Sequence, residues 1–98
     1  MEKRTPHCNP AVVKALVAAG KVRATVSALA GAAALELDLP GIVAVLEALT
    51  ARDFHKSMTT HGDHTIWRDI YRRITAAGRV YLKLTVIDDV LIVSFKEL

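Results

Sequence analysis

The 98-residue sequence is poor in several residue types that would define its function directly. Its single cysteine, Cys8, excludes an internal disulfide and lacks the companions that a zinc site needs. One tryptophan, two tyrosines and two phenylalanines leave little material for platforms that stack on nucleic-acid bases. No apolar run approaches the roughly 20 residues of a membrane span, and the charged start Met1–Arg4 is not followed by an apolar stretch. We therefore expect an intracellular protein with neither a signal peptide nor a membrane anchor.

Lysine and arginine are also missing from a long stretch in the middle of the chain. Residues 24–51 contain neither, and their only charged residues are Glu36, Asp38 and Glu47. Between Arg68 and Lys83, in contrast, five cationic residues stand against the single carboxylate of Asp69, a net charge of +4. A polyanion would approach this second region. The charges alone fit a solvated strand face equally well.

Helical spacing of apolar residues dominates the first half of the chain. Asn9 is a typical N-cap residue and Pro10 is typical of the first position of a helix. Together they predict a helix over 10–19, which Gly20 ends. Residues 21–24 form a connector or an edge strand. A second, alanine-rich helix is predicted with an apolar face made of Val26, Leu29, Ala30, Ala33 and Leu37. Asp38 caps a third helix, which should end near Thr50.

After residue 51 the pattern becomes extended, with β-branched and aromatic residues in alternation. Strands are predicted over 53–60 and 65–71, separated by a turn at 61–64. A C-terminal hairpin follows, with Asp88 and Asp89 at its tip. The predicted class is α+β: N-terminal helices packed on a mainly antiparallel sheet that ends in this hairpin, all within one domain over residues 1–98.

The side-chain pattern predicts the register of the hairpin. An even-length loop gives one continuous apolar face with the pairs Leu82–Phe95, Leu84–Val93 and Val86–Leu91. The same register gives the other face the pairs Tyr81–Lys96, Lys83–Ser94 and Thr85–Ile92. An odd-length loop would mix apolar and polar side chains on both faces, so we expect the even one.

Few residues suggest catalytic chemistry. His61 and His64 read as turn residues rather than metal ligands, and Asp88 and Asp89 as turn formers. There remain the polar hairpin residues Tyr81, Lys83 and Lys96 with the cations Lys56 and Arg68 on neighbouring strands. Metal-free RNA cleavage needs such groups: a base for the ribose 2′-hydroxyl, cations for the phosphorane and an acid for the departing 5′-oxygen. A tyrosine beside lysines is also common as a plain cross-strand pair.

Long stretches of the sequence resemble the MqsR toxins, messenger RNA interferases related to the RelE and YoeB fold. The likeness runs from Met1 to Lys96, and it is carried by residues 1–7, 54, 56–60, 63–67 and 90–97. The resemblance implies a metal-independent and ribosome-independent endoribonuclease of the bacterial cytoplasm that prefers GCU-like sites and uses no cofactor. The family's catalytic lysine, glutamine, tyrosine and C-terminal lysine fall here on Lys56, Arg68, Tyr81 and Lys96. Arg72, Arg73 and Lys83 are expected to bind RNA.

Two positions depart from the family pattern that the resemblance implies. Arg68 replaces a neutral amide with a fixed cation that can clamp phosphate, so base preference can differ. His55 stands in place of a tyrosine and adds an imidazole capable of proton transfer, which makes it a further candidate site residue.

The resemblance also implies a protein partner and leaves a second class of function open. The partner is an MqsA-type antitoxin with a zinc-holding N-terminal domain and a DNA-binding C-terminal domain, so DNA would be contacted only indirectly. An exposed sheet edge is a natural docking place. The alternative function is a non-catalytic module that binds RNA or the antitoxin, and a purely structural protein is a third possibility.

Overall fold

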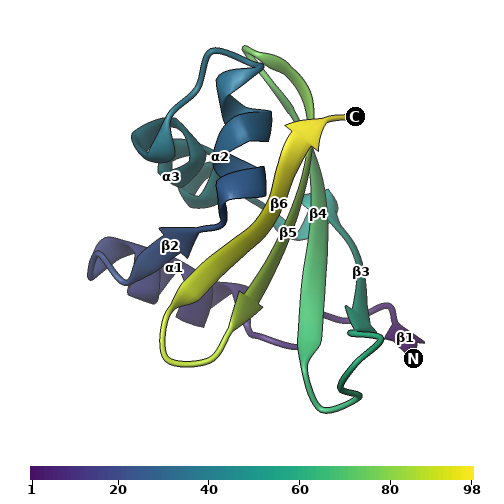
Figure 1. The fold of residues 1–98 in the computed structure, drawn as a ribbon. Coiled ribbons are helices and arrows are strands. Elements are labelled where there is room, and N and C mark those ends of the chain that lie inside the picture. Colours follow the sequence, from purple (N-terminus) through teal and green to yellow (C-terminus); the bar gives the residue numbers. More distant parts are fainter.

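The computed structural model describes residues 1–98 as three helices on one side of a six-stranded sheet (Figure 1). The predicted α+β class is confirmed. The elements, in chain order, are β1 (Glu2–Lys3), α1 (Pro10–Ala18), β2 (Val22–Ala24), α2 (Val26–Ala33), α3 (Leu39–Ala48), the 3-10 turn η1 (Ala51–Asp53), β3 (Phe54–Thr59), β4 (Trp67–Thr75), β5 (Gly78–Val86) and β6 (Val90–Glu97). None of the helices is both long and apolar enough to cross a bilayer.

The strand order is β1-β3-β4-β5-β6-β2, and only β2 runs parallel to its neighbour. The edge strand considered for residues 21–24 is therefore present, whereas the two-residue strand β1 was not predicted. Strand β4 extends to Thr75, beyond the predicted end at residue 71. Its pairing with β5 continues to the Thr75–Gly78 pair, where Gly78 turns the chain with a φ angle of 114°.

Helix α2 differs from its prediction in length and in buried face. It ends at Ala33, and Glu36 adopts a positive φ of 59° shortly afterwards. Its buried residues are Ala28 and Ala32, whereas Val26 is 84% exposed. The reason lies at Gly31, where a Cβ atom would collide with the Phe95 carbonyl oxygen of β6. Small side chains let this helix approach the sheet closely. The helix therefore turns its alanines and Gly31 toward the sheet and leaves the larger Val26 exposed.

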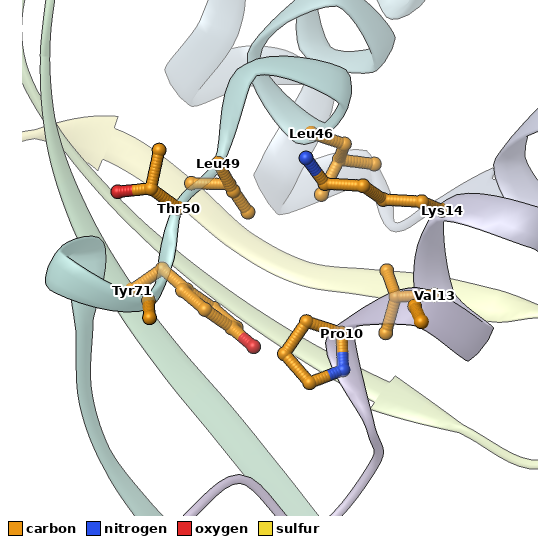
Figure 2. Close-up of a pocket in the computed structure, with 9 residues that line it drawn as sticks. Pro10, Val13, Lys14, Leu46, Leu49, Thr50 and Tyr71 are labelled. Carbon is orange, nitrogen blue, oxygen red and sulfur yellow. The ribbon is translucent and has the colours of Figure 1, made fainter.

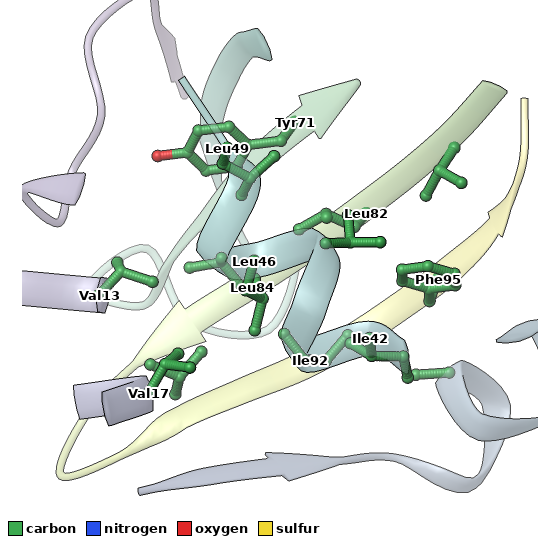
Figure 3. Close-up of a cluster of buried hydrophobic side chains, with 14 of the residues drawn as sticks. Val13, Val17, Ile42, Leu46, Leu49, Tyr71, Leu82, Leu84, Ile92 and Phe95 are labelled. Carbon is green, nitrogen blue, oxygen red and sulfur yellow. The ribbon is translucent and has the colours of Figure 1, made fainter. Parts of the chain in front are cut away.

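The core lies between the helices and the inner face of the sheet, and it forms one cluster of 15 buried residues. Figure 3 shows side chains of α1 and α3 meeting those of β4, β5 and β6. Tyr71 of β4 belongs to this cluster and is 2% exposed. Burial, with smaller contributions from Asp69 and Cys8, raises its pKa to about 12, so its hydroxyl stays neutral. We call this helix-covered side of the sheet the inner face.

The register of the C-terminal hairpin is partly as predicted. The pairs Tyr81–Lys96, Leu82–Phe95 and Lys83–Ser94 are confirmed. Beyond them the register shifts by one residue, so the predicted pairs of Leu84 with Val93, Thr85 with Ile92 and Val86 with Leu91 are wrong. Leu84 faces Ile92, Thr85 faces Leu91 and Val86 faces Val90 instead. The extra residue, Val93, forms a bulge that lets both Phe95 and Ile92 enter the core.

The close contact at Gly31 makes a testable prediction about stability. Gly31→Ala should lower the free energy of unfolding by about 1–3 kcal/mol, because α2 must move away from β6 to admit the methyl group. Gly62→Ala is the control, since a Cβ there meets nothing within 4 Å, and its change should stay within about 0.5 kcal/mol. Urea unfolding of both variants measures the difference. Equal stability would contradict the close packing.

Candidate active site

The candidate residues on β5 lie on the side of the sheet that no helix covers. Val80, Leu82 and Leu84 are buried in the core on the inner face. Because side chains alternate along a strand, Tyr81 and Lys83 project to the opposite side, which we call the outer face. The same alternation places Lys96 on the outer face, next to the buried Phe95. The helices thus leave this part of the sheet open to a ligand.

Strand pairing arranges the outer-face residues in two rows across the sheet. In one row Lys56 of β3 faces Ile70 of β4, which faces Lys83 of β5, which in turn faces Ser94 of β6. In the other row Arg72, Tyr81 and Lys96 follow one another from β4 to β6. Neighbouring strands are roughly 5 Å apart, so Lys56 and Lys83 are separated by roughly 10 Å at the backbone. Both side chains are long enough to reach a common ligand.

Arg68 completes this group from the diagonal position, two residues before Ile70 on β4. It is partly buried and makes no ion pair. Its Nε atom is buried without a hydrogen-bond partner. No carboxylate lies within ion-pair distance of the guanidinium. A fixed cation therefore stands beside the lysines of the outer face.

Tyr81 and Lys96 are in direct contact. The Lys96 ammonium lies 5.1 Å from the centre of the Tyr81 ring, within the range of a cation–π interaction. Lys96 is exposed, whereas Tyr81 is partly buried. The pairing predicted from the hairpin register thus places an ammonium beside a phenol at one end of the outer face.

Lys56 is held by a carboxylate from the N-terminal strand. Its Nζ atom donates a hydrogen bond of 2.6 Å to the Oε1 atom of Glu2, and this contact lowers the pKa of Glu2. Glu2 reaches this place because β1 pairs with β3. The buried Asp69 carboxylate fixes the segment that follows β1, since it accepts hydrogen bonds from the backbone amides of His7 and Cys8 at 2.9 and 3.0 Å. The sequence analysis did not identify Glu2, and only the strand pairing indicates its role.

His55 lies at a bulge in β3, between Phe54 and Lys56. Its Nε2 atom is 2.9 Å from the Nη2 atom of Arg72. Desolvation lowers the pKa of His55, and the cations Arg72, Lys56 and Arg4 lower it further against the opposing effect of Glu2. The imidazole is therefore favoured in its neutral form, with Nε2 accepting the arginine hydrogen bond.

Arg73 is the one predicted site residue that lies elsewhere. It pairs with Val80 in the β4–β5 register, so it projects to the inner face. There its Nη1 atom donates a 2.9 Å hydrogen bond to Asp53, which is partly buried. The structure brings together the other predicted site residues, which are His55, Lys56, Arg68, Arg72, Tyr81, Lys83 and Lys96.

An apolar cavity lies on the inner face, away from these cations. It has a volume of about 290 Å³ and is enclosed by α1, the end of α3 and Tyr71 (Figure 2). In this view the Tyr71 hydroxyl points toward Pro10, and it has no hydrogen-bond partner. The cavity holds no cluster of charged groups, because Lys14 is the only charged residue in its lining. Acid–base chemistry is thus concentrated on the outer face.

Comparisons with known proteins identify the family of this chain. The family model described as "Motility quorum-sensing regulator, toxin of MqsA" matches residues 5–97. The mRNA interferase toxin MqsR of Escherichia coli K12 is 60% identical over 97 residues, which cover 99% of each chain. The chain belongs to the MqsR toxin family. The resemblance read from the sequence is therefore confirmed.

One outer-face residue, Lys83, has a position that the sequence analysis did not predict. Lys83 was predicted only to contact RNA, yet it occupies the middle of the cationic group. Its burial, together with the charges of Arg68, Lys96 and Lys56, lowers its pKa. The alternation of β5 indicates the face of Lys83. Its central place depends on the order of four strands, which the local sequence pattern does not contain.

The contact between Arg72 and His55 can be tested by titration. Arg72→Gln should raise the pKa of His55 toward its ordinary value but not fully to it, because desolvation is the larger cause of the shift. NMR titration of the His55 imidazole in the two proteins measures the change. Identical titration curves would show that the guanidinium does not act on this ring.

Proposed function

We propose that this chain is a toxin that cleaves messenger RNA as a sequence-selective endoribonuclease, without a metal and without the ribosome. One observation supports it most strongly: Lys56, Tyr81 and Lys96 share a face of the sheet with no helix over it. The similarity to the E. coli mRNA interferase toxin supports the same activity. A cytoplasmic location follows from the substrate, and GCU-like sites are the preference that family membership suggests.

The chemistry follows from the types of side chain on the outer face. In RNA cleavage the substrate provides the nucleophile, since the ribose 2′-oxygen attacks the adjacent phosphorus. The charge that develops on the phosphorane oxygens is stabilised by Arg68, whose guanidinium can donate two hydrogen bonds to phosphate, and by Lys96. Tyr81 is placed to exchange a proton with the reacting oxygens, while Lys56 is held as a cation by Glu2. Arg72 extends the phosphate-binding surface beyond Tyr81.

A digestion in the presence of a chelator tests this function. Purified protein in EDTA should cleave single-stranded RNA and leave a 2′,3′-cyclic phosphate, which mass spectrometry detects. Lys56→Ala and Tyr81→Phe should each reduce the rate by about 100-fold or more, the scale of a lost acid–base or charge-stabilising group.

Lys21→Ala provides the matched control for this digestion. It removes one positive charge from an exposed side chain that makes no ion pair, so its rate should equal that of the wild type. Cleavage that requires Mg²⁺ would contradict the proposed mechanism. RNA binding without cleavage would favour the non-catalytic module.

We further propose that the partner is an MqsA-type antitoxin that contains zinc. The family description, toxin of MqsA, supports the pairing. The protein encoded beside this one should carry two Cys-x-x-Cys pairs and form a complex that no longer cleaves RNA. Zinc measured by atomic absorption should accompany the complex and the isolated partner. A partner that inhibits without zinc would overturn this assignment.

A further inference from the structure

Three lysines share the outer face, and their surroundings differ. Lys56 is bound to the Glu2 carboxylate at 2.6 Å and is therefore engaged as a cation. Lys96 is exposed, with its ammonium beside the Tyr81 ring. Lys83 is partly buried, and it has neither an ion pair nor a side-chain hydrogen bond. Among these amines it is the one without a stabilising partner.

The burial of Lys83 has a structural cause on the outer face itself. Ile70 lies directly between Lys56 and Lys83 in the strand register and is only 1% exposed, although no helix covers this side. It does not belong to the inner core cluster, so its cover comes from side chains of the outer face. The aliphatic stems of the two flanking lysines are suited to this. Packing over Ile70 keeps water away from the Lys83 stem.

The groups that face Lys83 from each neighbouring strand are cations or neutral groups. Lys56 comes from β3, Arg68 from β4 and Lys96 from β6, and all three lower the pKa of Lys83 in addition to its burial. On the diagonals of the register lie Arg72 of β4 and, on β5 itself, Tyr81. Glu2 on β1 is bound to Lys56, and no carboxylate lies within ion-pair distance of Lys83. Protonation of this amine is therefore opposed from every side.

We propose that Lys83 is the general base that accepts the 2′-hydroxyl proton of the RNA. This assignment rests on the proposed ribonuclease function and gives it a specific base. It follows from the central position of Lys83, its place opposite a buried isoleucine in the strand register and the absence of an anionic partner. The surrounding cations serve two purposes, since they attract the phosphate and keep this amine ready to accept a proton.

The proposed step is balanced in atoms and charge. The neutral Lys83 amine takes the proton from the 2′-oxygen, and that oxygen forms a bond to phosphorus. The bond from phosphorus to the 5′-oxygen breaks, and the leaving oxygen receives the proton of the Tyr81 hydroxyl. The Lys96 ammonium beside the ring stabilises the remaining phenolate. Afterwards the Lys83 ammonium loses its proton to solvent and Tyr81 regains one, so the enzyme returns to its starting state.

A substitution that keeps the charge separates the role of a base from that of a phosphate contact. Lys83→Arg retains a cation but cannot lose its proton near neutral pH. We expect kcat to fall by about 100-fold or more, while the Kd for RNA, measured in EDTA at fixed salt, changes by less than about threefold. Thermal unfolding of the variant confirms that it is folded. A variant that cleaves like the wild type would overturn the role of Lys83 and leave the ribonuclease function standing.

The pH dependence gives a second readout. Because the Lys83 base must be neutral and the Tyr81 acid must be protonated, kcat/KM of the wild type should follow a bell-shaped pH profile whose rising limb reports the pKa of Lys83. Arg68→Gln removes one of the cations that lower this pKa, so the rising limb should move to higher pH even where the maximum rate falls. An unmoved limb would contradict the assignment.

A measurement independent of activity completes the test. NMR of isotope-labelled lysines should find the Lys83 amine titrating below the usual range of a lysine side chain, and Arg68→Gln should reduce the difference. Titration of Lys83 within the usual range would overturn the proposal. If the wild type cleaves no RNA at all, the proposed function and this inference both fail. If the wild type cleaves RNA and Lys83→Arg cleaves it equally well, only this inference fails.

Discussion

The hydrogen-bonded pairing of β3, β4, β5 and β6 holds together a group of cations that would separate without it. Lys56, Lys83, Lys96 and Arg68 come from four different strands, and their mutual repulsion opposes folding. The energy that overcomes it comes from the inner face, where 15 residues form the core. The inner face of the sheet thus provides stability, whereas the outer face carries a cluster of cations in which only Lys56 has a carboxylate partner.

The bulge at Val93 reconciles two demands on β6. The core needs both Ile92 and Phe95, which are three residues apart and cannot share a face of a regular strand. The outer face needs Lys96 opposite Tyr81. The extra residue Val93 lets Ile92 and Phe95 both enter the core while Lys96 stays opposite Tyr81. Gly31 adds to this arrangement, because it lets α2 approach the backbone carbonyl of Phe95.

The sequence alone predicts much of this fold because its signals are local. Helix caps at Asn9 and Asp38, and alternation along residues 79–87, mark elements that the structure contains. The alternation predicts the contact of Tyr81 with Lys96, which needs only one hairpin. It gives the wrong register between Ser94 and the hairpin tip. The bulge there arises from competition between core residues on two strands and the helices, which a local pattern does not contain. Likewise, periodicity assigns Val26 and Leu29 to a buried face, but the close fit of α2 against β6 leaves both side chains exposed.

The sequence predicts which residues gather on the outer face better than it predicts how they are arranged there. The residues implied by family resemblance at 56, 68, 81 and 96 do lie on one face. Arg73, selected for its charge, projects to the other side, since it follows Arg72 directly on a strand. Glu2 and the central position of Lys83 depend on β1 pairing with β3 and on the order of the strands, which are contacts between distant parts of the chain. Such relations are properties of the assembled sheet.

Arg68 illustrates how one substitution acts through this assembly. The family pattern implies a neutral amide at this position, and an amide would leave Lys83 with two cationic neighbours rather than three. A guanidinium cannot lose its charge, so it lowers the pKa of Lys83 at every working pH. It also has no carboxylate to compensate it. The residue that departs from the family pattern therefore strengthens both properties on which the proposed chemistry depends, namely attraction of phosphate and neutrality of the base.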